Sequence, residues 1–157
     1  MRIADYLTEQ DIAFESLLLP PAFTAQKRAK YLSVPGSQVA KCVLLRTRGG
    51  LMLAVLPATH QVDEAALAAA LHGPVRLATE EEMASVFHDC EWGVVPPLGR
   101  LYGLPSLLDE AIDPDAFLIF EGQTHVEAIR LRCRDFERLE KPRRLRFARR
   151  PEGSARD

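Results

Sequence analysis

The sequence predicts an α+β domain with a mixed, mostly antiparallel sheet and flanking helices, because helical and hairpin patterns are interleaved along the chain. Two pairs of apolar runs each flank a short turn: residues 39–45 with 51–57, and residues 116–120 with 125–131. Paired runs of this kind are typical of β-hairpins. A chain of 157 residues is long enough for one domain with a substantial core.

The elements before the first hairpin follow from apolar spacing and from the prolines. An amphipathic first helix is expected over residues 3–12, and a short strand over 14–19 ends at a proline pair. A second helix is expected from an N-cap at Thr24 through Leu32.

The first hairpin turns at Thr47–Gly50, and both of its strands are apolar on both faces, which is typical of central strands. After it, Asp63 is the expected N-cap of a helix through Leu71. Thr79 with Glu82 forms the capping-box pattern of a further helix.

The last third of the chain predicts shorter elements. Residues 101–108 are expected to form short strands broken by Gly103 and Pro105. The second hairpin turns at Glu121–Thr124, and a short helix is expected near Arg134–Leu139.

Charge is distributed unevenly, although the formal net charge is only −2. Residues 138–157 contain eight Lys/Arg and three Asp/Glu, whereas the rest of the chain is acidic. We therefore divide the chain into a domain at 1–141 and a basic, flexible C-terminal tail at 142–157. The tail either contacts a polyanion such as RNA or is simply solvated.

The composition argues against membrane and secreted classes. No apolar run approaches the roughly 20 residues that a membrane-spanning helix needs, and the first 15 residues lack the apolar core of a signal peptide. The three cysteines, Cys42, Cys90 and Cys133, are odd in number and far apart, which fits a reducing cytoplasm rather than a disulfide framework.

Three reactive side chains are adjacent at His88, Asp89 and Cys90. Neighbouring side chains of an extended strand point to opposite faces, so Asp89 could not orient His88 toward Cys90. A cysteine nucleophile is therefore a minor hypothesis, and a zinc site lacks further ligands at suitable spacing.

The following residues, Gly93 to Pro97, suggest a loop whose backbone shape matters. Glycine permits close approach of a ligand, and proline fixes the backbone. The loop could aim backbone groups at a substrate or be a rigid turn. Lys41 enters an apolar strand, where it could hold a phosphate or an oxyanion, or extend its ammonium to water.

Two further side chains fall near the expected rim of the core. His125 opens the last strand and could face the core, or be a hydrogen-bonded turn histidine. Asp109 follows two leucines and could reach the same rim, or cap the segment that follows.

These features occur in an order that resembles a known family. The order is F-T-A near residue 23, V-A-K-C-V-L-L at 39–45, A-V-L-P at 54–57, D-C-E-W-G-V-V-P-P-L-G at 89–99, L-L-D at 107–109 and E-G-Q-T-H at 121–125. The chain resembles the YbaK/prolyl-tRNA-synthetase-associated editing-domain family over roughly residues 1–140. It is most similar to a free-standing bacterial branch whose members also occur fused to signalling domains.

The resemblance implies a trans-editing aminoacyl-tRNA deacylase that hydrolyses the ester of a mischarged tRNA carrying a small amino acid. Water would be the nucleophile, assisted by the 2′-hydroxyl of the terminal adenosine, and no cofactor or metal is expected. Carried over by position, the catalytic residues would be Lys41, Gly93, Asp109 and His125. The substrate-binding residues would be Thr24, Val94, Val95, Pro96, Pro97 and Gly99, and the basic segment suggests tRNA contacts at Arg143, Arg144 and Arg146.

The expected partners are the acceptor end of tRNA and an aminoacyl-tRNA synthetase, with no membrane association and a monomeric state. Two positions depart from the family: Cys42 stands where Ser or Thr is usual, and Gln123-Thr124 leaves His125 without an adjacent acid. The alternatives are a non-catalytic tRNA- or nucleotide-binding module and a Cys90-dependent hydrolase.

Overall fold

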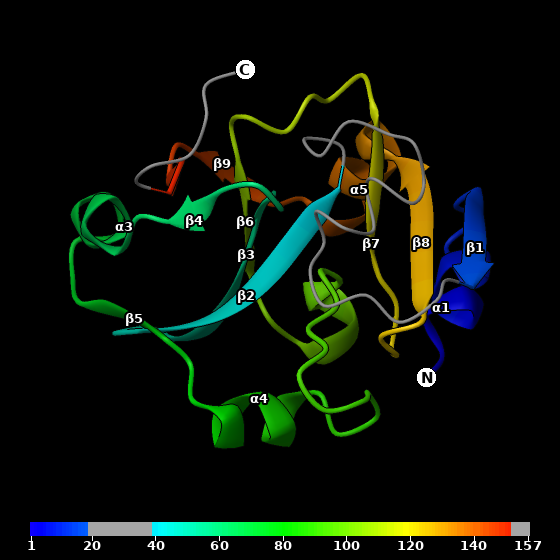
Figure 1. Ribbon diagram of the computed structural model, residues 1–157, viewed down its shortest axis with the longest axis horizontal. Helices are drawn as coiled ribbons and strands as arrows, with labels where there is room; N and C mark the ends of the chain where they lie inside the picture. The colour runs from blue at the N-terminus through cyan, green and yellow to red at the C-terminus, as the bar shows by residue number, and fades with distance from the viewer. Residues whose placement is uncertain (19–38, 152–157) are drawn as a thin grey trace.

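The computed structural model describes residues 1–18 and 39–151. The expected helix from Thr24 through Leu32, and Thr24 itself as a site residue, lie outside the described residues. Within them the chain forms a mixed α+β domain, as predicted (Figure 1).

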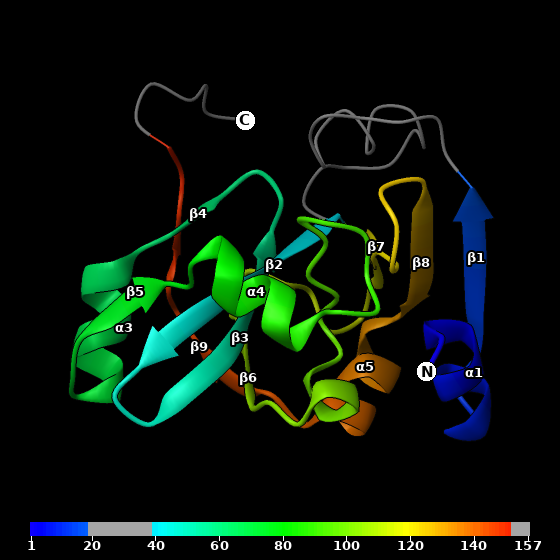
Figure 2. The same ribbon diagram turned by 90° about the horizontal axis from the view of Figure 1, so that it is seen from below.

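One part of the domain is a three-stranded antiparallel sheet with the order β1-β8-β7. Helix α1 and helix α5 pack against it and share one apolar core with it (Figures 1 and 2). The bounds of these elements are α1 Ile3–Glu9, β1 Phe14–Leu18, β7 Phe117–Glu121, β8 Glu127–Arg132 and α5 Cys133–Glu140. The N-terminal segment and the second predicted hairpin are therefore joined in one sheet.

The other main part is a five-stranded sheet with the order β5-β2-β3-β6-β9. Its strands are β2 Ala40–Thr47, β3 Gly50–Pro57, β5 Val75–Leu77, β6 Ser106–Asp109 and β9 Arg143–Leu145. The predicted hairpin is confirmed, because β2 and β3 pair antiparallel from Ala40↔Pro57 to Thr47↔Gly50. Both strands are interior in the sheet, which explains why they are apolar on both faces.

Two helices begin where their capping residues predict. Helix α3 (Glu64–Leu71) has Asp63 as N-cap, and the Asp63 carboxylate accepts a hydrogen bond from the Ala66 amide at 3.0 Å. Helix α4 (Glu80–Val86) has the complete capping box between Thr79 and Glu82. These local signals are reliable because they satisfy amide groups that the first helical turn leaves unpaired.

The segment from 99 to 105 differs from the expected short strands. Residues Gly99–Tyr102 form a turn of 3₁₀ helix, and a Cβ on Gly99 would lie only 2.5 Å from the Leu104 carbonyl oxygen. Gly103 follows with φ +72°, in the left-handed region. Close backbone packing, rather than strand pairing, therefore dictates the shape here, and the strand begins only at Ser106.

The basic segment is not a flexible tail in the described range. It forms β9 and then β10 (Ala148–Arg149), which pairs with β4 (Gln61–Val62). Phe147, between β9 and β10, is 1% exposed and packs in the core with α3. The predicted boundary at residue 142 is therefore corrected, because the segment carries a large apolar anchor as well as its arginines.

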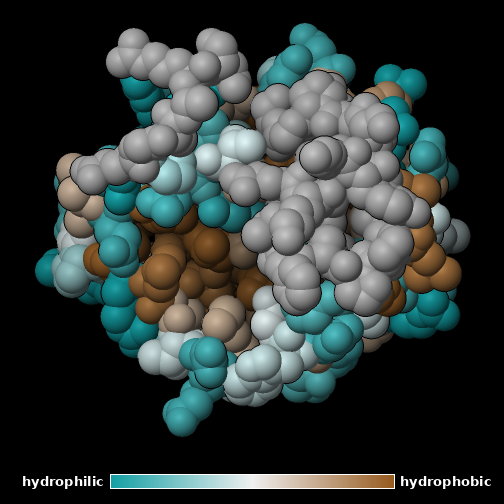
Figure 3. All heavy atoms as spheres, in the orientation of Figure 1, coloured by the Kyte–Doolittle hydropathy of each residue, from teal (hydrophilic) through white to brown (hydrophobic). Residues whose placement is uncertain are grey.

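Apolar surface remains on one side of the five-stranded sheet, between α3 and β2 (Figure 3). In the core cluster that this sheet shares with α3, side chains such as Val43, Val62 and Leu71 are only partly buried. None of the helices among the described residues is long and apolar enough to cross a bilayer.

Candidate functional site

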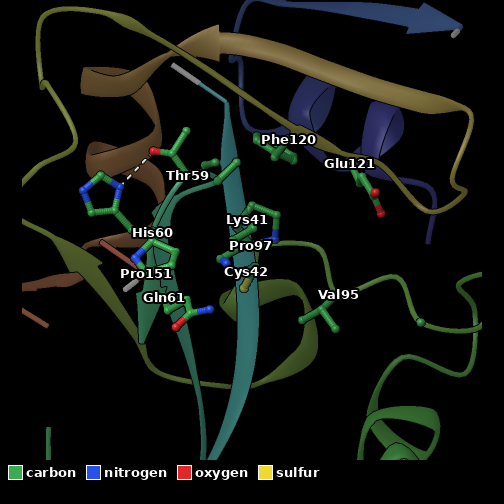
Figure 4. Close-up of a pocket in the computed structure, with 13 residues that line it drawn as sticks. Lys41, Cys42, Thr59, His60, Gln61, Val95, Pro97, Phe120, Glu121 and Pro151 are labelled. Atoms are coloured by element: carbon green, nitrogen blue, oxygen red, sulfur yellow. Dashed lines mark hydrogen bonds between the residues drawn. The ribbon is translucent and has the colours of Figure 1, made fainter. Parts of the chain in front are cut away.

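A cavity of about 390 Å³ lies where the start of β2, the end of β3 and the end of β7 meet. The main chains of β2 and β3 are held together there by the Ala58 amide, which donates to the Val39 carbonyl at 2.8 Å. The residues that line the cavity are Ala40, Lys41, Cys42, Ala58, Thr59, His60, Gln61, Gly93, Val95, Pro97, Phe120, Glu121 and Pro151 (Figure 4). This volume is in the range of small-molecule sites.

Lys41 lies in the middle of this group, and β2 places it there (Figure 4). Its position opposite Leu56 in the β2–β3 ladder fixes its backbone. Burial lowers the pKa of the Lys41 ammonium, because a partly dehydrated cation is less stable than one in water. A cation in such a place interacts strongly with an anion that enters the cavity, since little water screens it.

The loop from Gly93 to Pro97 forms one wall of the cavity. Gly93, Val95 and Pro97 line the cavity, and Gly93 has φ +86°, a conformation that favours glycine. Val94 and Pro96 are buried and do not line it. The loop thus presents every second residue to the cavity, so Gly93, Val95 and Pro97 line it as predicted, whereas the predicted substrate-binding residues Val94 and Pro96 do not.

Gly99 was expected in the substrate-binding set, but it is buried and does not line the cavity. Its lack of a Cβ is required by the Leu104 carbonyl oxygen, as described above. The role of this glycine in the structure is to permit close packing behind the loop.

His125 anchors the loop through hydrogen bonds to the two residues that precede Gly93. Its Nε2 lies 2.8 Å from the Trp92 carbonyl oxygen, and its amide donates to the Glu91 carboxylate at 3.0 Å. A carbonyl oxygen only accepts, so Nε2 carries the hydrogen and is not available to take a proton from substrate. The Glu121 carboxylate lies 3.5 Å from Nδ1 and supplies the acid that the adjacent residues lack.

Replacing His125 by alanine is expected to lower the activity proposed below about 5- to 30-fold, because the loop loses one anchoring hydrogen bond and its backbone becomes mobile. The pH dependence of the rate should keep its shape, since Nε2 is not a general base. The measurement is a pH–rate profile of both proteins. If the rate of the variant no longer rose with pH where the wild-type rate does, this interpretation would be contradicted and His125 would be the general base.

Asp109 is in a different place from the one predicted. It is 2% exposed, does not line the cavity, and its carboxylate accepts hydrogen bonds from the amides of Ala111, Phe147 and Ala148 at 2.8–2.9 Å. Asp109 therefore fastens the C-terminal segment to the end of β6. A catalytic role for this carboxylate is not supported by these contacts.

Asp89 and Cys90 belong to a polar network beneath the loop. The Tyr102 hydroxyl donates to Asp89 at 3.0 Å and lies 3.3 Å from the Cys90 sulfur, and the Gln123 amide donates to Asp89 at 3.2 Å. The side-chain carbonyl oxygen of Gln123 accepts a hydrogen bond from the Ile3 amide at 3.2 Å. The network therefore ties the loop to the turn before β8 and to the N-terminus.

Cys90→Ala is expected to retain most of the activity proposed below, because the thiol is not the nucleophile. Burial is the main reason that the pKa of the Cys90 thiol rises to about 11, so almost none of it is the nucleophilic thiolate at neutral pH. Initial rates of the wild-type protein and the variant should agree within about twofold, which the loss of the two weak thiol contacts, with Asp89 and Tyr102, allows. An inactive but folded Cys90→Ala protein would restore the thiol as nucleophile.

The three predicted tRNA-binding arginines differ in their surroundings. Arg144 donates to the Glu137 carboxylate at 2.6 Å and to the Ile112 carbonyl at 2.9 Å, so its guanidinium is part of the fold. Arg143 and Arg146 are exposed. None of the three lines the cavity.

Nine lining residues were outside the predicted site, and four of them carry side-chain oxygen or nitrogen: Thr59, His60, Gln61 and Glu121. The Thr59 hydroxyl lies 2.9 Å from His60 Nδ1. The sequence could have indicated the first three, because they follow a buried strand closely. The ends of neighbouring strands meet at one edge of a sheet, and residues that follow them gather there. Among the described residues no group of His, Cys, Asp and Glu is arranged to hold a metal ion.

The comparison with family models identifies the class of this fold and site. The model of the aminoacyl-tRNA editing domain matches residues 19–139, so the chain belongs to the aminoacyl-tRNA editing domain family. No curated protein matches the chain significantly.

Solved structures share the fold at low sequence identity. A hypothetical protein superposes with a TM-score of 0.84 at 16% identity, covering 95% of this chain and 100% of its own. A candidate trans-editing enzyme for prolyl-tRNA synthetase has a TM-score of 0.77 at 23% identity, covering 87% of each chain. A candidate signal transduction protein from Marinobacter aquaeolei has a TM-score of 0.73 at 19% identity, covering 92% of this chain but 30% of its own.

Proposed function

We propose that this protein is a trans-editing aminoacyl-tRNA deacylase, which hydrolyses the ester of a mischarged tRNA that carries a small amino acid. One observation carries the proposal: in a chain of the editing-domain family, a single cavity contains the partly buried Lys41 and the Gly93–Pro97 loop. The candidate trans-editing enzyme among the structural neighbours supports it.

A small amino acid suits the walls of the cavity. Ala40, Val95, Pro97 and Phe120 provide apolar surface, and a rigid loop leaves little room for adaptation to a larger side chain. Editing of small residues has a physical reason, because a synthetase discriminates against the loss of one methylene by only about 1–3 kcal/mol. A second hydrolytic site supplies the missing discrimination.

The chemistry needs no protein nucleophile, because the ester is already activated. A water oxygen attacks the carbonyl carbon, the ester C–O bond breaks, and the terminal ribose hydroxyl leaves with a proton. Lys41 stabilises the oxyanion of the tetrahedral intermediate, together with a backbone amide of the loop. The substrate's 2′-hydroxyl orients the water. Burial also raises the pKa of the Cys42 thiol far above its usual value, which keeps this lining residue neutral.

The direct test is a deacylation panel of tRNAs mischarged with alanine, serine, cysteine or threonine. The purified protein is expected to hydrolyse at least one of them faster than the spontaneous rate. Absence of hydrolysis across the whole panel, at micromolar protein, would overturn the proposal.

A non-catalytic binding module is the second candidate. It is favoured by the structural neighbour in which this fold makes up 30% of a candidate signal transduction protein. Tight binding of tRNA or nucleotide without turnover, and unchanged by substitution of Lys41, would decide for this function.

The basic strand β10 is a suitable contact for the tRNA backbone. Arg149 pairs with Gln61, which lines the cavity, and both Arg149 and the predicted Arg146 are exposed. We expect the double variant Arg146→Gln/Arg149→Gln to bind tRNA more weakly and to reduce the salt slope of binding by about one per arginine. Arg138→Gln, an exposed arginine on α5, is the matched control.

Point substitutions are needed for this test, because deletion from residue 142 would remove β9 and the buried Phe147. An unchanged salt slope in the double variant would exclude β10 as a tRNA contact. A synthetase partner is also part of the proposal, as family membership implies.

A further inference from the structure

Trp92 is the only tryptophan of the chain, and it is 62% exposed beside the proposed active site. Exposing so large an apolar ring to water is unfavourable in free energy, and the fold leaves this ring uncovered. The backbone beneath it is fixed. The Trp92 carbonyl oxygen lies 2.8 Å from His125 Nε2, and the Glu91 amide donates to the Gln123 carbonyl at 2.8 Å.

A second cavity, of about 240 Å³, lies under Trp92 between helix α4 and the loop. It is lined by Glu80, Met83, Ala84, Phe87, His88, Cys90, Glu91, Trp92, Gly93 and Val94. Gly93 also lines the first cavity, so the two hollows adjoin at this residue. A ligand that occupies the first cavity can therefore continue into the second across Gly93.

We propose that Trp92 and the second cavity bind an unpaired nucleobase of the tRNA acceptor end, with the base stacked on the indole. This inference rests on the proposed function, since it assigns the neighbouring subsite of the same substrate. The acceptor end is the single-stranded sequence C-C-A, and unpaired bases stack on aromatic side chains.

The charges of the second cavity favour a base over a phosphate. Its lining contains two carboxylates, Glu80 and Glu91, and one histidine, His88. The carboxylates outnumber the histidine; they repel a phosphate but accept hydrogen bonds from the exocyclic amines of adenine and cytosine. Met83 and Phe87 supply the apolar side of the hollow. All three bases of C-C-A carry such an amine, whereas uracil has none.

The sole tryptophan makes the subsite directly observable by intrinsic fluorescence. Titration with a short single-stranded RNA ending in C-C-A is expected to quench Trp92 emission, and an RNA ending in U-U-U should require an about tenfold higher concentration. Glu80→Gln should reduce this preference. A fluorescence signal that does not change with either RNA would overturn the inference.

Kinetics separates this inference from the proposed function. Trp92→Ala is expected to raise the KM for a mischarged tRNA about 5- to 100-fold with kcat unchanged, and Trp92→Phe should recover most of the loss because it retains an aromatic ring. Equal KM in the wild-type and Trp92→Ala proteins would overturn the subsite while leaving deacylation intact. Quenching by C-C-A RNA without any deacylation would instead overturn the proposed function and retain the subsite.

Discussion

Lys41→Ala is expected to deacylate a mischarged tRNA about 100- to 1000-fold more slowly than the wild-type protein, with a smaller effect on KM. In the proposed mechanism Lys41 contacts the charge that develops on the carbonyl oxygen, and removal of one such donor costs about 2.7–4 kcal/mol. Single-turnover rates at saturating protein measure this loss without interference from product release.

Lys41→Met is the matched control for packing, because methionine retains a long, unbranched side chain without the charge. It should be as slow as Lys41→Ala and at least as stable as the wild-type protein. Burial lowers the pKa of Lys41 in the folded state, so folding disfavours the ammonium form. The stability of the wild-type protein therefore rises with pH as this group loses its proton, and Lys41→Met lacks that contribution. A Lys41→Met protein with unchanged rate would contradict the proposed role.

Asp109→Ala is expected to lower the free energy of unfolding by about 3–5 kcal/mol, because three amides lose their acceptor inside the protein. Two of these amides belong to Phe147 and Ala148, so the C-terminal segment should detach first. Urea denaturation measures the change, and amide hydrogen exchange locates it.

Asp109→Asn separates a structural from a catalytic role. The side-chain carbonyl oxygen of Asn can still accept from the amides of Phe147 and Ala148. Only the hydrogen bond from the Ala111 amide is lost, because the amide NH2 group of Asn would face that N–H. Asn should therefore cost less stability than Ala and leave the activity of the folded protein intact. A stable but inactive Asp109→Asn protein would contradict the structural role.

The fold could be predicted where the signals are local. The hairpin from Val39 to Pro57 and the capping residues Asp63 and Thr79 satisfy backbone groups within a few residues of themselves. The strands β9 and β10 were missed because their pairing partners are distant in the sequence, and because an arginine-rich segment resembles a solvated tail. Phe147 and Leu145 are the apolar residues there that could have indicated burial.

Only part of the candidate site could be predicted from the sequence. Lys41, Gly93, Val95 and Pro97 meet in one cavity, as their ordered resemblance to the family implied. The resemblance also places His125 and Asp109 at this cavity. In the structure, His125 instead anchors the loop, and Asp109 anchors the C-terminal segment. Which side of a chain segment faces a cavity depends on distant contacts, and spacing alone does not determine it.

A single-turnover comparison of the wild-type protein and Lys41→Met on one mischarged tRNA shows whether the chain is a deacylase that depends on the Lys41 ammonium. We expect the wild-type protein to release the amino acid well above the spontaneous rate and the folded Lys41→Met protein to be at least about 100-fold slower. Equal rates in the two proteins, or no release by either above the spontaneous rate, would contradict this expectation.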